Sequence, residues 1–320
     1  MRVVATLILR RLALGLLTLW LVSLLVFGAT LALPGDTATA ILGRDATPAR
    51  LTALRAQLDL DEPVVSRYVS WLKGMATGDL GESAATREPV GKLLSDRVAN
   101  SAALVLVAGL IAIPLSLLLG VLAAVRRDGW FDQIGSTTGL VLAAIPEFVI
   151  ALVLVLVFAT TLVQWLPAVS LAQPGERVWS SPQSMVLPVA TLVLAVVPYL
   201  ARVMRSSMVE ILASDYVTNA RLRGLSRRRV TWRHALPNAI VPGIQASALQ
   251  LAWMASSVVV VEYVFAFPGI GTTLVDAVGN RDIPVVQAVT MIAAAVYVVC
   301  NLVADVATIL LTPKLRTRAR

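Results

Sequence analysis

The sequence predicts an all-α integral membrane protein with six transmembrane helices. Of its 320 residues, 58% are hydrophobic and 14% are charged, whereas soluble domains average roughly 45–50% apolar and about 25% charged residues. The mean hydropathy is +0.81. A soluble fold of this size could not bury so much apolar surface without leaving large apolar patches in water, so most classes of soluble enzyme are excluded.

Six stretches of the chain reach the length of about 20 apolar residues that a spanning helix requires. Two of them contain one charged residue each, Glu147 and Asp305. The predicted spans are Leu12–Gly35, Val98–Val125, Gln133–Val163, Val178–Ala201, His234–Val261 and Ile283–Leu311.

Positively charged side chains gather in alternate connecting segments. If the N-terminus is cytoplasmic, the inner segments hold 17 Lys and Arg against four acids, and the outer segments hold 10 against 13 acids. An excess of Lys and Arg marks the cytoplasmic loops of membrane proteins. We therefore expect a multi-pass protein of the plasma or inner membrane with both termini in the cytoplasm. The topology then explains the net charge of +8, which therefore does not indicate a nucleic-acid partner.

This topology divides the chain into four regions. In the external region, two stretches have apolar residues at the spacing of a helix, Ala49–Leu58 after Thr47-Pro48 and Val64–Met75 after Pro63. These two helices either cap the outer ends of the spans or form a docking surface for an external partner. The regions are the cytoplasmic N-terminus with the first span (1–35), the external helical segment (36–97), the core of five spans (98–311) with a cytoplasmic loop at 202–237, and the cytoplasmic tail (312–320).

Several kinds of chemistry are excluded by the residues that the chain lacks. The single cysteine, Cys300, excludes a disulfide framework and a multi-thiolate metal site. The single histidine, His234, leaves no nucleophile-base constellation for an intramembrane hydrolase. No Gly-x-x-x-x-Gly-Lys-Ser/Thr loop is present to bind ATP phosphates. We therefore expect no catalytic, cofactor-binding or metal-binding residues and no enzymatic activity.

The loop between the fourth and fifth predicted spans is expected to form two short helices joined by a glycine. Ser214 would cap the first helix, and Asp215 in its first turn complements the helix dipole. Arg221 and Arg223 complement the dipole at the other end, and Gly224 occupies the position that favours a left-handed backbone. Such an element between two spans is suited to transmit force, although it could also be a loop whose arginines meet anionic lipid headgroups.

The second helix would begin after Ser226 and end near Leu236-Pro237. It opens with Arg227-Arg228-Arg229, whose charges are of the wrong sign for a helix N-terminus. A local rule that is broken in this way often marks a site with another use.

Two blocks of this loop resemble the cytoplasmic loop of ABC-transporter permeases, in particular those of the dipeptide, oligopeptide and nickel importer branch. In that family the loop reads Glu-Ala-Ala, three residues, Gly, and then Leu-Pro. Gly224 and Pro237 keep the family's spacing, and Thr218-Asn219-Ala220 stands where the triplet belongs. The blocks are Asp215-Tyr216-Val217-x-x-Ala220-Arg221-x-Arg223-Gly224-Leu225-Ser226 and Arg233-His234-Ala235-Leu236-Pro237-Asn238-Ala239.

Further motifs of the same branch lie along the whole chain. Departures from the branch pattern stand at Thr37, Asp59 and Thr312-Pro313-Lys314. The matching motifs are Leu33-Pro34-Gly35-Asp36, Leu58-Asp59-Leu60-Asp61-Glu62-Pro63, Gly78-Asp79-Leu80-Gly81-Glu82-Ser83, Val261-Glu262-x-Val264-Phe265-x-x-Pro268-Gly269-x-Gly271 and Asn280-Arg281-Asp282-x-Pro284-Val285-Val286-Gln287.

The resemblance implies a type I importer permease, embedded in membrane lipid, that forms half of a translocation pathway. It implies four partners, which are a second permease subunit, two ATP-binding subunits and an external solute-binding protein. The solute would be a dipeptide, an oligopeptide, a nickel complex or a glutathione-like peptide. The residues expected to couple the chain to an ATPase are Asp215, Tyr216, Ala220, Arg221, Arg223, Gly224, Leu225 and Pro237.

The alternative is a secondary transporter that works alone. Such folds often contain paired broken helices in two inverted halves, and the sequence shows no such pair.

Glu147 is a candidate for the solute pathway or its gate. It lies about 14 residues into the third predicted span, near the bilayer midplane at roughly 1.5 Å per residue. An intramembrane carboxylate is a functional candidate by default, although a paired or protonated structural role is the alternative. In the fifth span, Asn238, Gln245, Trp253 and Ser256 fall near one stripe, which suits either a pathway or a contact between helices.

Glu262 and Arg281-Asp282 lie at the outer ends of the last two spans. They could form an outer gate or contact the binding protein, or Glu262 could belong to a structural turn built on Pro268-Gly269 and Gly271. Asp305 and Asn301 are expected to pack between helices, His234 to pack between the loop and the helices, and Cys300 to fill an ordinary apolar position.

Overall fold

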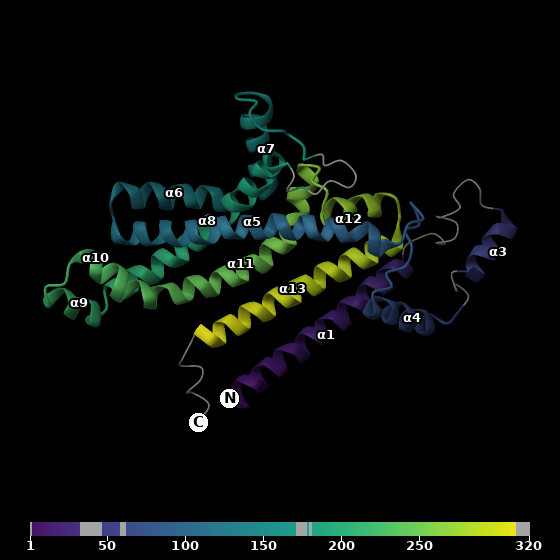
Figure 1. The fold of residues 1–320 in the computed structure, drawn as a ribbon, viewed down its shortest axis with the longest axis horizontal. Coiled ribbons are helices and arrows are strands. Elements are labelled where there is room, and N and C mark those ends of the chain that lie inside the picture. Colours follow the sequence, from purple (N-terminus) through teal and green to yellow (C-terminus); the bar gives the residue numbers. More distant parts are fainter. Residues whose placement is uncertain (1, 33–46, 58–61, 171–177, 179–180, 312–320) are drawn as a thin grey trace.

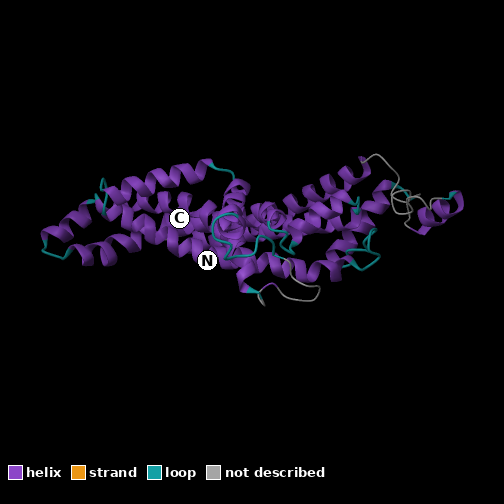
Figure 2. Ribbon diagram, turned by 90° about the horizontal axis from the view of Figure 1, so that it is seen from above, coloured by secondary structure: helices purple, strands orange, loops and turns teal. Residues whose placement is uncertain are grey.

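The computed structural model describes residues 2–32, 47–57, 62–170, 178 and 181–311, and these residues fold into helices and connecting loops without a strand (Figures 1 and 2). Among these described residues, five helices are long and apolar enough to cross a membrane, and the number is six if one bent pair counts as a single span. The all-α fold and the approximate count of six spans are therefore confirmed.

The spanning helices agree in order with the predicted spans. The third span consists of three pieces, and the fifth continues a short helix from the preceding loop. The bounds are α1 Arg2–Ala32, α5 Val90–Val125, α6 Trp130–Ala144, α7 Glu147–Val155 with η2 Leu156–Thr160, α8 Pro182–Leu212, α11 Leu236–Val264 and α13 Ile283–Leu311.

The third span is not the single straight helix that the sequence predicted. The axes of α6 and of the α7–η2 segment differ by 104°. Pro146 disfavours a helical backbone at the residue before it, and Ile145 is accordingly extended, with φ −88° and ψ 127°. Glu147 thus lies in the first turn of a new helix rather than inside a continuous one.

Several boundaries differ from the prediction. Helix α5 begins at Val90 rather than Val98, and α8 continues to Leu212 through residues that were expected to form a loop. Neither glycine nor proline interrupts residues 199–213, and buried Met204 and Met208 extend the apolar face of the helix by one more turn. A further helix, α12 Ile270–Gly279, was missed within the predicted connection.

Helix α8 lies at the centre of the bundle and packs against α5, α6, α7 and α11, while α13 packs between α11 and α1 (Figure 1). Gly120 allows α5 to approach α8 closely, because a Cβ atom there would lie 2.6 Å from the carbonyl oxygen of Ala201. The main core includes Leu104, Leu192, Leu200, Met254, Phe265 and Phe267.

Apart from the segment around α7 and η2, the connecting elements gather at two ends of the bundle (Figure 1). At one end, which we call the α9 end, lie α9 Asp215–Leu222, α10 Arg227–Arg229 and the turn between α5 and α6. At the other, the α12 end, lie α12, α4 Val64–Thr77 and the loop before α5. This separation agrees with the predicted alternation of the segments.

Helix α4 packs on α1. The Tyr68 hydroxyl lies 2.7 Å from Ser23 Oγ, and the Phe27 ring contacts the rings of Tyr68 and Trp71 at centroid distances of 5.4 and 5.5 Å. These contacts favour the structural cap over the docking surface for this helix. Helix α3, Pro48–Gln57, stands apart from the bundle in Figure 1.

Some predictions fall outside the described residues. They concern the motifs at 33–36 and 58–61, the departures at Thr37 and Asp59, and the tail 312–320 with its Thr312-Pro313-Lys314.

Candidate coupling loop and pathway residues

The C-terminal end of α9 has the geometry that the sequence predicted. Gly224 has φ +78°, its N–H donates to the carbonyl of Arg221 at 2.9 Å, and the N–H of Leu225 donates to the carbonyl of Ala220 at 3.4 Å. These two bonds define a Schellman motif, which ends a helix by satisfying its last carbonyls. The left-handed position of Gly224 is therefore confirmed.

The N-terminal end of α9 differs from the prediction. The Ser214 hydroxyl, expected to accept a bond from an α9 amide, donates instead to the carbonyl of Ile211 at 2.6 Å. Because α8 ends at Leu212, two residues earlier, the Ser214 hydroxyl bonds a carbonyl in the last turn of α8 rather than an amide of α9. Asp215 stands in the first turn of α9, as expected.

Helix α9 buries one face and exposes the other. Val217 and Ala220 pack into a second core with Met204, Met208 and Val230. On the opposite face the side chains are exposed, among them Tyr216, Arg221 and Leu222, the last of which is 80% exposed. The helix therefore presents a mixed apolar and charged surface beyond the ends of α5 and α8.

Tyr216 connects α9 to the start of α11. Its hydroxyl accepts a hydrogen bond from Asn238 Nδ2 at 3.1 Å and donates to the carbonyl of His234 at 3.4 Å. This contact involves the backbone of His234, so the packing role expected for its side chain stays a prediction. This contact ties the position of α9 to the fifth span.

The sequence predicted that the second short helix ends near Leu236-Pro237. The structure shows that it does not end there. Helix α10 continues through a π-helical turn, η4 Val230–Ala235, directly into α11. Proline lacks an N–H, and its ring clashes with the carbonyl four residues earlier. The wider turn before Pro237 accommodates this residue without a break in the rod.

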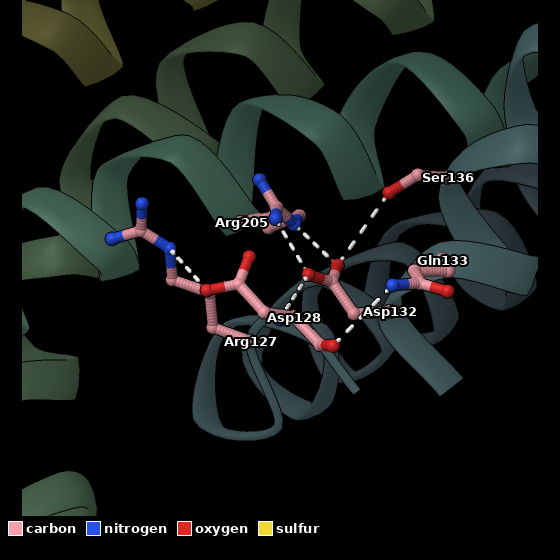
Figure 3. A network of polar contacts seen from close by, with 6 residues as sticks. All are labelled: Arg127, Asp128, Asp132, Gln133, Ser136 and Arg205. Atoms are coloured by element: carbon pink, nitrogen blue, oxygen red, sulfur yellow. Dashed lines mark hydrogen bonds and ion pairs between the residues drawn. The ribbon is translucent and has the colours of Figure 1, made fainter. Parts of the chain in front are cut away.

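An ion pair that sequence reasoning missed joins α6 to α8 (Figure 3). Arg205 donates to Asp132 through Nε at 2.5 Å and through Nη2 at 2.6 Å. Asp132 is 3% exposed, and it also accepts bonds from the N–H of Asp128 at 3.0 Å and from Ser136 Oγ at 3.5 Å. The pair fixes the α5–α6 turn to the helix that leads into α9.

A signal for this pair was present in the sequence. Arg205 stands on the apolar stretch between Met204 and Met208, and an acidic residue follows Gly129 in the first turn of a helix. Both residues were counted as loop charges because the third predicted span begins at Gln133 and the fourth ends at Ala201.

Glu147 lies where the third span breaks, against α11. Its Oε2 is buried, and within the described part of the chain it has no hydrogen-bond partner. The hydroxyl of Ser257 on α11, which the sequence analysis did not select, is its polar neighbour and is also buried without a partner among the described residues. Trp253, one turn before Ser257, is 43% exposed. Gln245 is half-buried farther along the helix.

Glu262 is fully buried and holds a turn together. Its Oε1 accepts a bond from Ser101 Oγ at 2.5 Å, and its Oε2 accepts one from the N–H of Gly271 at 2.6 Å. A side chain at Gly269 or Gly271 would collide with this carboxyl group. Of the two roles considered for Glu262, this geometry favours the structural turn over a gate.

Asp282 joins two of the sequence motifs at the α12 end. It accepts bonds from Ser83 Oγ at 2.5 Å and from the N–H groups of Ala84 and Ala85 at 3.1 and 3.3 Å. The motif that begins at Gly78 is thus attached to the start of α13. Asp282 is 3% exposed, which favours a structural role for it as well.

Asp305 packs between helices as predicted, but its partner is different. Its carboxylate lies 3.2 Å from Arg11 Nη1 of α1, whereas Asn301 donates to the carbonyl of Tyr297 within its own helix. Cys300 is half-buried among the apolar residues of α13. The described residues contain no group of three His, Cys, Asp or Glu that could hold a metal ion.

Comparisons with known proteins cover nearly the whole chain. Residues 116–317 match the family described as binding-protein-dependent transport system inner membrane component, and residues 4–105 match its N-terminal counterpart. A putative peptide transport system permease protein of Brucella abortus (strain 2308) is 34% identical over 310 residues, 97% of this chain and 98% of that protein.

Two further relatives have the same coverage, 97% of this chain and 98% of their own length. A probable peptide ABC transporter permease protein of Sinorhizobium fredii is 34% identical over 309 residues. A glutathione transport system permease protein of Salmonella choleraesuis is 35% identical over 310 residues. The chain therefore belongs to the binding-protein-dependent transport system inner-membrane components, as an ABC-transporter permease of the dipeptide/oligopeptide importer branch.

Proposed function

We propose that this chain is one of two transmembrane subunits of an ATP-driven importer of peptides or related small solutes. It forms half of the solute pathway and carries no catalytic chemistry of its own. Its partners are a second homologous permease, two ATP-binding subunits and an external solute-binding protein. The names of the relatives, which refer to peptides and glutathione, support this class of solute.

The observation that carries this proposal is the form of α9. The helix is short, ends in a Schellman motif, and is attached to α8 and α11 through a buried face. Its opposite face exposes Tyr216, Arg221 and Leu222, which suits a groove on another protein. We assign α9 as the coupling helix that an ATPase subunit binds, with Asp215, Arg223, Leu225 and Pro237 supporting its geometry.

Movement of α9 would reach the spans by two routes. One is the hydrogen bond that Asn238, at the start of α11, donates to the Tyr216 hydroxyl. The other is the continuous chain from α9 back into α8, which the Arg205–Asp132 pair ties to α6. ATPase closure would then shift the population between inward-open and outward-open states. The pathway residues in this proposal are Glu147, Gln245 and Trp253. Glu262 instead supports the turn at the α12 end.

A crosslinking experiment tests the assignment of α9. Leu222 is 80% exposed on α9, and Leu110 is 74% exposed on the membrane-spanning helix α5. In a Cys300→Ala background, Leu222→Cys should crosslink to a co-expressed ATPase subunit, and the matched Leu110→Cys should not. A permease that transports solute alone, without co-purifying ATPase subunits, would instead support the secondary transporter.

The orientation in the membrane is part of the same proposal. We place the α9 end and both termini in the cytoplasm and residues 36–97 outside. Ala76 on α4 and Thr218 on α9 are both exposed. In the Cys300→Ala background, Ala76→Cys should react with a membrane-impermeant thiol reagent in intact cells, and Thr218→Cys only after the membrane is opened. The reverse labelling order would overturn the orientation.

A further inference from the structure

A basic hollow lies at the α9 end, on the segment that joins α10 to α11. It has a volume of about 450 Å³ and is lined by Ser226, Arg228, Arg229, Trp232 and Arg233. We call these residues the Arg–Trp hollow. None of them belongs to the surface of α9 that we assign to the ATPase.

The spacing of these residues places one aromatic ring and three guanidinium groups together. Residues three and four apart share one face of a helix, so Arg228 and Arg229 stand one turn before Trp232 and Arg233. All four side chains are exposed. Within the described part of the chain, no acidic side chain lies within salt-bridge distance of these three arginines. Like charges on one helix face repel each other, which an anion between them would relieve.

The length of the helical rod indicates the depth of the hollow in the membrane. From Trp232 to Val261 the rod covers about 44 Å at a rise of roughly 1.5 Å per residue, and a bilayer with both headgroup layers measures about 40–45 Å. Trp232 and Arg233 therefore fall at the level of the headgroups when Val261 reaches the opposite surface. A half-exposed tryptophan is typical of that layer.

We propose that the Arg–Trp hollow binds the phosphate of an anionic phospholipid. The planar guanidinium groups of Arg228, Arg229 and Arg233 match phosphate oxygens in pairs, and Trp232, which is 46% exposed, lies along the glycerol and upper acyl region. This site would also explain why Arg228 and Arg229 stand at the start of a helix whose dipole disfavours them.

A bound lipid would hold the segment that carries α9. Ser226 follows the Gly224-Leu225 end of α9 by one residue, and Val230 of the π-helical turn packs into the same core as Val217. Fixing the hollow to the headgroup layer therefore fixes the height at which α9 is presented. The lipid source is favoured over an acidic face of the ATPase because the hollow combines its charge with an exposed indole ring at headgroup depth.

The test measures lipid binding to the purified permease, in its complex where partners co-purify. A photoreactive phosphatidylglycerol analogue in phosphatidylcholine vesicles should label residues 226–233, and native mass spectrometry should show phosphatidylglycerol bound in preference to phosphatidylcholine. Each basic residue near an anionic membrane contributes about fivefold. The triple variant Arg228→Gln/Arg229→Gln/Arg233→Gln should therefore weaken phosphatidylglycerol binding about a hundredfold.

Two matched variants keep the result interpretable. The triple variant to Lys retains the charge but loses the paired guanidinium donors, so it should weaken binding less than the glutamine triple variant does. Arg126→Gln/Arg127→Gln removes two exposed cations from the α5–α6 turn at the same end and should leave labelling of residues 226–233 unchanged. If the glutamine triple variant fails to insert, the single change Arg229→Gln should still lower binding about fivefold.

Several outcomes would overturn the proposal. Equal binding of phosphatidylglycerol and phosphatidylcholine is one, and unchanged labelling in the glutamine variants is another. Inorganic phosphate that displaces the lipid analogue at equal concentration would assign the hollow to a free anion. Loss of ATPase co-purification in the triple variant, with phosphatidylglycerol binding intact, would assign it to the ATPase. None of these results depends on whether α9 couples to an ATPase, so the two proposals fail separately.

Discussion

The two ends of the bundle use their polar residues differently. At the α12 end, the carboxyl groups of Glu262 and Asp282 are buried and accept hydrogen bonds from Ser101, Ser83 and backbone amides. On α9 and α10, charged residues such as Arg221 and Arg229 are exposed. The buried carboxyl groups at the α12 end are thus satisfied by the chain itself, whereas the charged groups on α9 and α10 remain accessible to other molecules.

The difference in burial separates structural residues from candidate binding residues. Residue type alone does not separate them. Glu262 and Asp282 had the same standing in the sequence as Asp215 and Arg221, since all four are charged residues within family motifs. Burial distinguishes them, because a buried polar group needs hydrogen-bond partners and its removal leaves those partners unsatisfied. Mutations at the two ends should therefore fail in different ways, by unfolding at the α12 end and by uncoupling at the α9 end.

The largest effect on stability is expected for Glu262→Ala. It leaves Ser101 Oγ and the N–H of Gly271 buried without an acceptor, each at about 1–3 kcal/mol. The loss should be about 2–5 kcal/mol, read as a lower temperature of thermal unfolding in detergent and a lower yield. The control Glu88→Ala removes an exposed carboxylate from the same end. A fully stable Glu262→Ala protein with impaired transport would restore Glu262 as a gate.

The next effect concerns the buried pair near the α9 end. Asp132→Asn weakens the double contact to Arg205 and should destabilise the protein by about 2–3 kcal/mol, less than a fully buried pair, because the Arg205 side chain is 30% exposed. The double variant with Arg205→Gln should be more stable than the sum of the single changes predicts. Arg127→Gln breaks the exposed contact to Asp128 and should have little effect. Additive losses would show that Asp132 and Arg205 do not act as a pair.

The sequence predicted the fold correctly where long apolar stretches or local turn residues determine the structure. It located six spans, the left-handed Gly224, and the helix after Pro63, since each depends on local chemistry. It did not locate the break at Pro146 as a 104° bend, because a proline inside an apolar stretch predicts either a kink or a new helix. It also missed the Asp132–Arg205 pair and the Ser257 neighbour of Glu147, which depend on which helices pack side by side.

A smaller effect on stability, with a large effect on coupling, is expected for Gly224→Val. A Cβ atom at Gly224 meets nothing within 4 Å, so the cost comes from the φ of +78° alone and should be about 1–2 kcal/mol. Because the strain falls on the Schellman turn, α9 should tilt while the spans stay folded. Solute-stimulated ATP hydrolysis should be lost, with the chain still inserted.

Gly279→Val is the matched control for this change. Gly279 also has open space around it, but its φ is not positive, and it lies at the α12 end. The Gly279→Val variant should therefore hydrolyse ATP and transport solute at rates close to those of the unmodified protein. Normal coupled transport in Gly224→Val, or equal losses in both variants, would contradict the coupling role of α9.

The smallest effect on stability is expected for Glu147→Gln, at a carboxyl group that belongs to neither end. Its Oε2 makes no hydrogen bond to the described residues, so the isosteric change breaks no such contact, and the stability should change by less than about 1 kcal/mol. A glutamine side chain has almost the same shape and can also bond a neighbouring hydroxyl such as that of Ser257, so the local shape is kept while the ability to carry charge is lost. If Glu147 serves the pathway, uptake of a peptide such as trialanine should change several-fold, while ATPase co-purification and basal ATP hydrolysis stay the same. Failure to assemble would instead give Glu147 a structural role like that of Glu262, and unchanged uptake across several peptides would remove it from the pathway.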